Sequence, residues 1–467
     1  MSESEKQIEV ARVSRRTVLK GLAAFGGAAL WGQGPVTRPG WWISRAPLQN
    51  SVLSMWSGAV TSGTATISAR LSADSAQVRF VASPFADMRS PVYSPYKVAN
   101  LALNNRVVKA TLTGLFPNVR YYYAVEYDGQ ADMSRIGRFK TFPTGAASFT
   151  VAFASCAVTG SSAPVFDLIR SLRPLLFLHT GDFHYENIDV NDRDLFRRAY
   201  DRVLAAPAQA ALYGDIPVNY IWDDHDYGAN NSDRTSPSRE AARLTYREYV
   251  PHYGLPAGTG NQAIYHAFTI GRVRFIVTDN RSERSPYTDP DTSQKTMLGA
   301  TQKAWFKQTL LAANGNYSLI VWVNSLPWIG LDGDDGWYLY ATERRELANF
   351  IKNRGIRNLV MLSGDAHMLA IDDGTNSDYA DGGGAGFPVM HAAALDSTPS
   401  VKGGPYSHGA FPGTGQFGLM TVTDSDGDVI HVSWQGKKDT GETVVSYSFT
   451  WPMPPRPGLF MPIIRQA

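Results

Sequence analysis

Gly181-Asp182-Phe183-His184-Tyr185-Glu186-Asn187 and Ile221-Trp222-Asp223-Asp224-His225-Asp226 are the two stretches that decide the fold of this 467-residue chain. Each stretch ends a hydrophobic run with carboxylate and imidazole side chains, which are groups that bind metal ions in proteins. We therefore expect the rest of the chain to bring these two clusters, and a few later residues, to one place.

Six apolar runs with the length of buried strands follow one another along the chain, at residues 151–154, 175–179, 218–222, 275–278, 319–323 and 359–362. Each is followed by residues that can bind a metal: Cys156, Asp182, Asp223 or Asp224, Asp279, Asn324, and Asp365 with His367. Turn chemistry explains an isolated Asp or Asn at a strand end, but it does not select Cys or Asp-x-His. Because ligands gather at the carboxyl ends of strands in open α/β sheets, the runs predict a shared metal site.

Helical patterns lie between these runs, at residues 165–172, 193–211, 239–250, 302–312 and 343–353. The alternation of strands and helices predicts an α/β architecture in which helices cover the sheet. Residues 265–278 have the pattern of a hairpin, which makes the sheet mixed. We assign this domain to residues 148–451 and the last residues, 452–467, to a C-terminal tail.

Residues 45–143 contain short alternating runs, such as 65–71, 77–82 and 121–127, which are separated by Gly, Ser, Asp and Asn. Runs of period two at this spacing predict a small β-sandwich. Residues 112–117, followed by three tyrosines, resemble the tyrosine corner of a fibronectin-III-like domain. This part offers no evident chemistry, so we expect a structural or positioning role.

The N-terminus, residues 1–35, has the features of a twin-arginine export signal with a linker. Arg15-Arg16 precedes the short apolar run 21–30, and the alternative is a basic tail with a chance pair of arginines. The run is too short for a stable membrane span. The expected partner is the twin-arginine translocation machinery, and the expected location is periplasmic, cell-wall-associated or secreted.

The charge balance argues against a nucleic-acid partner. The chain has 44 basic and 42 acidic residues, and removing residues 1–35 leaves 39 of each. Neither a net positive charge nor a long basic run is then available to bind a phosphate backbone. Cys156 is the only cysteine, which excludes an intramolecular disulfide.

Cys156, Asp182 and Tyr185 point to the kind of metal. Each oxygen of a carboxylate such as Asp182 can take a separate cation, so this residue can bridge two metals. Thiolate and phenolate ligands favour iron over magnesium. The alternative for Cys156 is a small buried hydrophobic residue, but its place at a strand end favours a ligand.

The motifs resemble those of a known family. Phe153–Cys156 (Phe-Ala-Ser-Cys), Ile221–Asp226 and Ser363–His367 (Ser-Gly-Asp-Ala-His) are similar to the motifs of PhoD-type alkaline phosphatases, which are binuclear metallophosphatases. Met55–Val60 resembles the start of that family's N-terminal β domain, and a twin-arginine signal is typical there. The resemblance covers nearly the whole chain past residue 50. It implies a layered αββα catalytic domain with a mixed sheet, after a fibronectin-III-like sandwich.

Carried over by position, the resemblance implies two metal sites that share Asp182. A ferric ion would be held by Cys156, Asp182, Tyr185 and His367. Calcium would occupy the second site, which Asp224, Asn324 and Asp365 complete, and hard oxygen donors suit that ion. Purple acid phosphatases have histidines where Asn324 and Asp365 stand, which argues against zinc or ferrous iron there. Whether Asp223 or its neighbour Asp224 is the metal ligand stays open.

Several other residues have two interpretations each. His225 is either the acid that protonates the leaving group or a supporting histidine, and Asn230 and Asn231 are either phosphate donors or a turn. Arg281 and Arg284 either clamp phosphate or form surface ion pairs.

Further polar residues receive no catalytic role. His184 is expected to point away from the metals. The stripe of Arg239, Arg243 and Arg247 is expected to be a solvated helix face. The acidic stretches 332–336 and 372–374 are expected to be solvated loops, and the alternative is that they form the rim of the site.

These observations predict an exported, metal-dependent hydrolase of phosphate esters that uses a metal-activated hydroxide. Its substrates would be phosphomonoesters, phosphodiesters or both. One alternative is a phospholipase-D-like phosphodiesterase. Another is a metal-stabilised, non-catalytic protein that binds cell-wall polymers.

Overall fold

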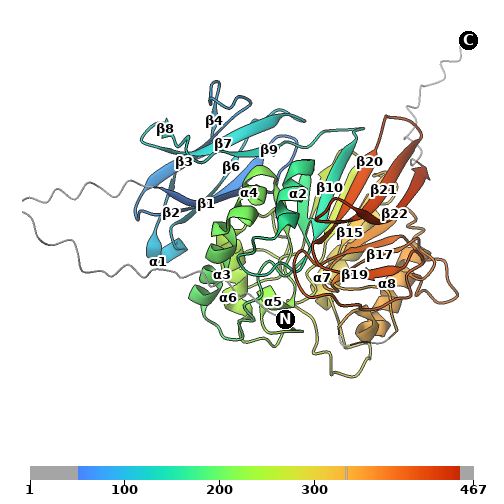
Figure 1. Cartoon of the computed structure of the whole chain (residues 1–467). Coiled ribbons are helices and arrows are strands. Elements are labelled where there is room, and N and C mark those ends of the chain that lie inside the picture. The colour runs from blue at the N-terminus through green and yellow to red at the C-terminus, as the bar shows by residue number, and fades with distance from the viewer. Residues whose placement is uncertain (1–50, 332, 334, 453–467) are drawn as a thin grey trace, which may run out of the picture. The chain divides into compact units, whose positions relative to one another are not determined.

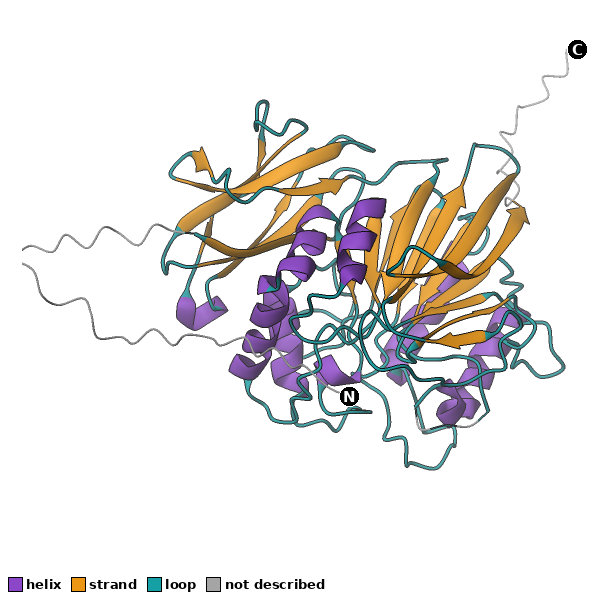
Figure 2. Cartoon of the chain, viewed as in Figure 1, coloured by secondary structure: helices purple, strands orange, loops and turns teal. Residues whose placement is uncertain are grey.

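The computed structural model describes residues 51–331, 333 and 335–452, all of which belong to one compact unit. The predicted export signal and nearly all of the C-terminal tail lie outside the described residues. Helices and several sheets alternate in the described part, so the prediction of a mixed α/β protein is confirmed (Figure 2). None of the described helices has the length and apolar character needed to cross a membrane.

The largest sheet contains nine strands (Figure 1). In spatial order they are β22 (Thr443–Pro452), β21 (Val429–Lys438), β20 (Gln416–Thr423), β10 (Phe149–Ala154), β11 (Leu176–His179), β12 (Val218–Tyr220), β1 (Val52–Gly58), β2 (Ala65–Leu71) and β6 (Val107–Leu112). β10, β11 and β12 run parallel, so their carboxyl ends meet at one edge. They correspond to the first three of the six predicted apolar runs, at residues 151–154, 175–179 and 218–222.

A second sheet contains the other three predicted strands among its seven. Its order is β13 (His266–Ile270), β14 (Val273–Val277), β15 (Leu319–Val323), β16 (Leu359–Ser363), β18 (Val389–Ala392), β17 (Met368–Asp372) and β19 (Ala410–Pro412). β14, β15 and β16 are parallel, whereas β13 and β14 form the predicted antiparallel hairpin. The prediction of a mixed sheet is therefore confirmed.

Alternation along β15 shows how the layers stack. Val321 and Val323 belong to a hydrophobic core shared with the nine-stranded sheet, whereas Ile320 and Trp322 belong to a second core with α7 and α8. The ring of Phe306 from α7 lies 4.5 Å from that of Trp322. Because successive side chains of a strand point to opposite faces, one face of this sheet meets the other sheet and the opposite face meets helices.

The described helices are α1 (Leu101–Asn104), α2 (Pro164–Leu172), α3 (Arg193–Ala205), α4 (Pro207–Asp215), α5 (Asp224–Tyr227), α6 (Arg239–Tyr249), α7 (Gly299–Ala313) and α8 (Ala341–Asn353), with a 3₁₀ turn at Trp337–Tyr340. Helices α2, α6, α7 and α8 agree with predicted positions, whereas the short helices α1 and α5 were not predicted. The single helix predicted over residues 193–211 was wrong, because α3 ends before Ala206, whose ψ is 125°. Proline at position 207 disfavours helical geometry in the preceding residue and lacks an N–H to continue the helix.

The N-terminal strands form two sheets. β1, β2 and β6 continue the nine-stranded sheet through a parallel pair between Gly58 and Val218. The six-stranded sheet comprises β3 (Gln77–Ser83), β4 (Val92–Tyr93), β5 (Lys97–Val98), β7 (Arg120–Tyr127), β8 (Gln130–Ala131) and β9 (Gly137–Lys140). The Phe116 N–H donates to the Tyr121 hydroxyl at 3.0 Å, which is the contact of a tyrosine corner. A fibronectin-III-like sandwich as a separate domain stays a prediction.

Gly58→Ala should weaken the junction between β1 and β12. A Cβ at this position would lie 2.5 Å from the Val218 carbonyl oxygen and 2.6 Å from that of Pro251, so the strands must move apart. We expect the free energy of unfolding in urea to fall by about 1–3 kcal/mol. In Gly63→Ala the new Cβ meets its nearest atom at 3.7 Å, so that control should change stability by less than about 0.5 kcal/mol. Equal stabilities of the two variants would contradict the prediction.

Candidate metal centre

Three predicted ligands stand on strained backbone at the carboxyl ends of strands. Cys156, Asp182 and Asp365 have φ values of 66°, 54° and 74°, a region that residues other than glycine rarely adopt. Gly181, at φ 123°, lies so close to the next strand end that a Cβ would meet the Asp223 Cβ at 2.5 Å. Strain of this kind persists where the surrounding structure imposes it, and it is concentrated at functional sites.

Cys156, Asp182, Tyr185 and His367 form the first group of predicted ligands, and they lie in contact. The Cys156 Sγ is 3.5 Å from the Asp182 Oδ2, and the Tyr185 hydroxyl is 3.0 Å from the His367 Nε2. The His367 Nδ1 bonds to the Thr398 carbonyl oxygen, so that nitrogen carries the proton and Nε2 keeps its lone pair. Such a bond is the usual support of a metal-binding histidine.

Burial sets the protonation of this first group. Burial and the charge of Asp182 hold the pKa of the Cys156 thiol well above its ordinary value. Burial, followed by Asp224, raises the pKa of Asp182, and burial raises that of Tyr185. The side chains therefore favour their protonated forms until a cation replaces the protons.

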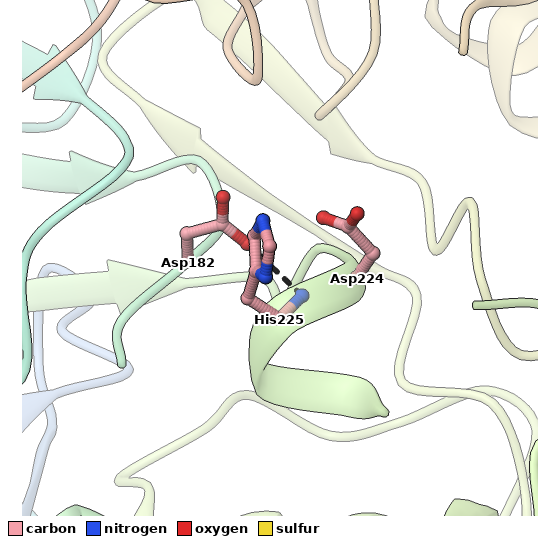
Figure 3. A group of neighbouring side chains, drawn as sticks. All are labelled: Asp182, Asp224 and His225. Atoms are coloured by element: carbon pink, nitrogen blue, oxygen red, sulfur yellow. Dashed lines mark hydrogen bonds between the residues drawn. The ribbon is translucent and has the colours of Figure 1, made fainter. Parts of the chain in front are cut away.

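A second group consists of Asp223, Asp224 and Asp365, each of which offers an oxygen within 4.8 Å of the others. Asp182, Asp224 and His225 form an overlapping group under the same limit, and the last two of these residues begin α5 (Figure 3). The Asp224 Oδ1 and the Asp223 Oδ2 are buried and have no hydrogen-bond partner among the described residues. Buried carboxylate oxygens without partners are costly, and a cation satisfies them, so both groups of side chains fit metal ions.

Contacts distinguish Asp224 from Asp223. The Asp223 Oδ1 accepts bonds from the Arg281 Nε at 2.5 Å and the Ser325 hydroxyl at 2.9 Å. Asp224 uses its Oδ2 to accept from the Asn231 N–H at 2.6 Å, and it belongs to both groups. Although burial raises the pKa of Asp224, Arg281 and His225 lower it below its ordinary value. What separates the two is therefore that Asp224 lies near Asp182 as well as near Asp365, whereas Asp223 is grouped with Asp365 but not with Asp182.

The side chain of Asn324 bonds to residues other than the predicted ligands. Its Oδ1 accepts from the Trp337 indole N–H at 3.1 Å and from the Asn280 amide, and its own amide donates to the Leu326 carbonyl oxygen. Metal binding by Asn324 would require these bonds to be exchanged.

Arg281 and Arg284 match neither of their two interpretations. Both are fully buried, and they bind opposite oxygens of Asp335, at 2.7 Å from the Arg281 Nη2 and 2.6 Å from the Arg284 Nη1. Asp335 lies in the stretch expected to be a solvated loop, but it is buried as well. Arg281 also pairs with Asp223 and, at 3.6 Å, with the Asp224 Oδ1, so its single positive charge is shared among three carboxylates beside the centre.

Two further expectations of solvation were wrong. Arg243 is buried, and its guanidinium donates to the Ser282 carbonyl oxygen at 2.9 Å and to Glu283 at 2.9 Å. Asp372 is also buried, and it accepts bonds from the Asn376 amide at 2.7 Å and the Ser407 N–H at 3.0 Å. In both cases neighbouring polar groups replace water.

His184 and His225, the two histidines near the first group of predicted ligands, have different surroundings. His184 is buried against the rings of Phe196 and Tyr200, so the prediction that it points away is confirmed. His225 is partly exposed, and its ring stacks on Tyr185 with centroids 4.2 Å apart. Its backbone N–H donates to the Asp182 Oδ1 at 3.3 Å, and its Nδ1 is 2.6 Å from the Asn187 Oδ1. His225 therefore faces the centre.

Asn230 and Asn231 follow α5. Asn230 is exposed, and Asn231 is partly buried with a φ of 58°. Its backbone N–H fixes Asp224, as described above, so one function of this turn is to hold that carboxylate.

Lys402 was missed by sequence reasoning. Its Nζ lies 3.0 Å from both oxygens of Asp365, and its side chain is 20% exposed. Lys402 belongs to a Gly-rich and Pro-rich segment between β18 and β19, follows no strand and matches no motif. A lysine in such a segment gives no sequence signal for a role at the centre.

Known proteins are similar to this chain in sequence and in fold. Residues 151–408 match the model of a family described as PhoD-like phosphatase. Alkaline phosphatase D of Bacillus subtilis (strain 168) is 25% identical over an alignment of 309 positions, and the match covers 54% of this chain and 52% of that protein. The chain thus aligns with about half the length of this curated relative.

Solved structures give the same result for the fold. A structure described as PhoD has a TM-score of 0.70 and 20% identity, and the match covers 86% of this chain and 90% of that one. A purple acid phosphatase from yellow lupin (Lupinus luteus) seeds has a TM-score of 0.57 and 13% identity, with 85% and 73% covered. The mixed α/β fold with several sheets is therefore similar to the folds of these two proteins.

Lys402→Met should change stability and metal binding in opposite directions. The substitution leaves Asp365 buried without its partner, so the chelator-treated protein should lose about 1–3 kcal/mol of unfolding free energy in a urea titration. Calcium should bind more tightly by calorimetry, because no ammonium then competes for Asp365. Lys97→Met, at an exposed lysine, is the control and should change neither quantity. Unaltered or weaker calcium binding in Lys402→Met would contradict the prediction.

Proposed function

The chain belongs to the PhoD-like phosphatase family, and on that basis we propose that it hydrolyses phosphate esters at the metal centre described above. One observation carries the proposal: Cys156, Asp182, Tyr185 and His367 come from three separate strand ends and meet in a chain of contacts. A thiol, a carboxylate, a phenol and an imidazole with a free Nε2 form a ligand set that suits iron.

The metals in the proposal are ferric iron and calcium. Iron would be held by the first group. Calcium would share Asp182 and take oxygens of Asp224 and Asp365, with Asn324 joining after its present bonds are exchanged. Two bound cations would together clamp phosphoryl oxygens and lower the pKa of a water, which is the chemistry needed for attack on phosphorus.

His225 is proposed as the proton donor for the leaving alkoxide. Asn187 accepts a bond from the Nδ1–H, so the ring would act in its doubly protonated, imidazolium form and transfer the proton on Nε2. Stacking on Tyr185 and the bond from the His225 backbone to Asp182 fix the ring beside the ligands. The side-chain amides of Asn230 and Asn231 are proposed to donate hydrogen bonds to a phosphate oxygen.

Cys156→Ser and Tyr185→Phe test the iron and the activity together. Purified wild-type protein should show an absorption band from charge transfer between iron and its thiolate or phenolate ligands. In each variant the band should weaken or shift. The kcat for nitrophenyl phosphate or bis-nitrophenyl phosphate should fall more than about 100-fold, the upper end for residues that only support ligands. Tyr287→Phe, at an exposed tyrosine, is the control and should keep both the absorption band and the kcat of the wild type.

The outcomes separate the rival functions. Unchanged colour and turnover in both variants would exclude the iron assignment. Release of choline from phosphatidylcholine, without hydrolysis of the nitrophenyl esters, would favour a phospholipase-D-like phosphodiesterase. Bound iron without hydrolysis of any ester across the pH range would favour a non-catalytic protein that binds cell-wall polymers.

Export by the twin-arginine route is a proposal from the sequence alone, because Arg15 and Arg16 lie outside the described residues. Replacing both with lysine removes the pair that the export receptor reads, so cell fractionation should find the variant inside the cell and the wild type outside the cytoplasm. Arg12→Lys changes an arginine outside the pair and should leave export intact. Equal export of all three proteins would contradict this route.

A further inference from the structure

A cleft of about 840 Å³ opens at the edge of the nine-stranded sheet that lies opposite the metal centre. Phe149, Leu175 and Pro217 line it, and they stand at or before the first residues of β10, β11 and β12. The predicted ligands follow the last residues of the same parallel strands. At roughly 3.3 Å per residue, the length of β10 alone separates the cleft from the centre by about 20 Å.

Basic side chains dominate the lining of the cleft. They are Arg120, Arg138, Lys140, Arg170 and Arg173, and the acidic lining residues are Asp167 and Asp215. The excess of positive charge is concentrated in a concave surface, which focuses the electrostatic field toward an anion.

Asp215 holds two of these arginines in place. Its Oδ1 accepts from the Arg138 Nε at 2.9 Å and its Oδ2 from the Arg170 Nε at 2.6 Å, while a second Arg138 nitrogen completes a bidentate contact. Both arginines remain 40% exposed, and their other N–H groups have no hydrogen-bond partner among the described residues. One carboxylate thus orients two guanidiniums and leaves one positive charge uncompensated.

Arg120 and Lys140 are placed directly opposite each other in the antiparallel pair of β7 and β9. Like charges in this position repel, and such pairs destabilise a sheet. In the described part of the chain, neither residue, nor Arg173 on the other wall, forms an ion pair. A bound anion would remove the repulsion.

We propose that this cleft binds a polyvalent oxyanion, a ligand that carries several phosphate or sulfate groups, at a site separate from the metal centre. The planar forks of Arg138 and Arg170 match the oxygens of such groups, and Lys140 with Arg120 supplies charge on the facing strands. The proposal does not depend on the function of the metal centre.

The probe is inositol hexasulfate, because it contains no phosphate ester that the metal centre could hydrolyse. Calorimetry should show binding of wild-type protein that weakens as sodium chloride is raised, since exposed charges are screened. Orthophosphate should bind this cleft far more weakly than the hexasulfate, because it engages fewer cations.

Lys140→Gln gives a signature that a loss of folding cannot imitate. Affinity for the hexasulfate should fall about tenfold, as expected for the loss of one charge-assisted contact. Its melting temperature should rise, because the repulsion from Arg120 is gone. Arg170→Met should also weaken binding, and Arg198→Gln, at an exposed arginine of α3 outside the cleft, should leave it unchanged.

Two results would overturn the proposal. One is equal affinity of wild type and the Arg120→Gln/Lys140→Gln double variant. The other is loss of hexasulfate binding in Asp224→Asn, which would place the anion at the metal centre instead. Hydrolysis of nitrophenyl esters should be the same in Lys140→Gln and wild type if the two sites are separate, and reduced turnover would count against that separation.

Discussion

Buried negative charge is the constraint on which the centre depends. Asp182, Asp223, Asp224, Asp226, Asp335 and Asp365 are all buried, and the buried or nearly buried cations that face them are Arg281, Arg284 and Lys402. Burial raises the pKa of Asp226 to about 8 and, against the opposing effect of Arg281, that of Asp223 to about 6. Although burial also acts on Asp335, Arg281 and Arg284 hold its pKa below the ordinary value. The arginines thus oppose the effect of burial on the carboxylates they contact, whereas the carboxylates without such a partner favour their protonated forms.

The same charges connect the two sheets at the edge where the ligands lie. Asp223 follows β12 of the nine-stranded sheet, and Arg281 follows β14 of the seven-stranded sheet. Their buried ion pair spans the two layers, and Asp335 extends it to the segment before α8. Removing one member of such a pair leaves a buried charge, so the network holds the ligand-bearing strand ends in register.

The parts of the fold and the site that follow local rules could be predicted from the sequence. Apolar period and length identified β10 to β12 and β14 to β16, and the residues after them supplied Cys156, Asp182 and Asp365. Non-local pairings could not be predicted. Arg281 and Asp335 are 54 positions apart, and each resembles an ordinary surface charge until burial is known. Lys402 lies in an irregular segment. Gly58 and Val218 are neighbours only in the folded protein, and no sequence pattern indicates that they pair.

The two proposed metal sites differ in what the protein itself places in them. In the first, the Nε2 of His367 is kept free by the bond of Nδ1 to Thr398, and the neighbouring thiol and phenol need only lose protons. In the second, the ammonium of Lys402 already bonds to both Asp365 oxygens, and Asn324 is bonded to Trp337. The Asp224 Oδ1 has no hydrogen bond to exchange among the described residues, and its ion pair with Arg281 is long, at 3.6 Å. A cation entering the second site must therefore displace the Lys402 ammonium from Asp365, whereas among the described residues no ammonium or guanidinium is bonded to the first group, and this difference in competitors makes the two affinities unequal.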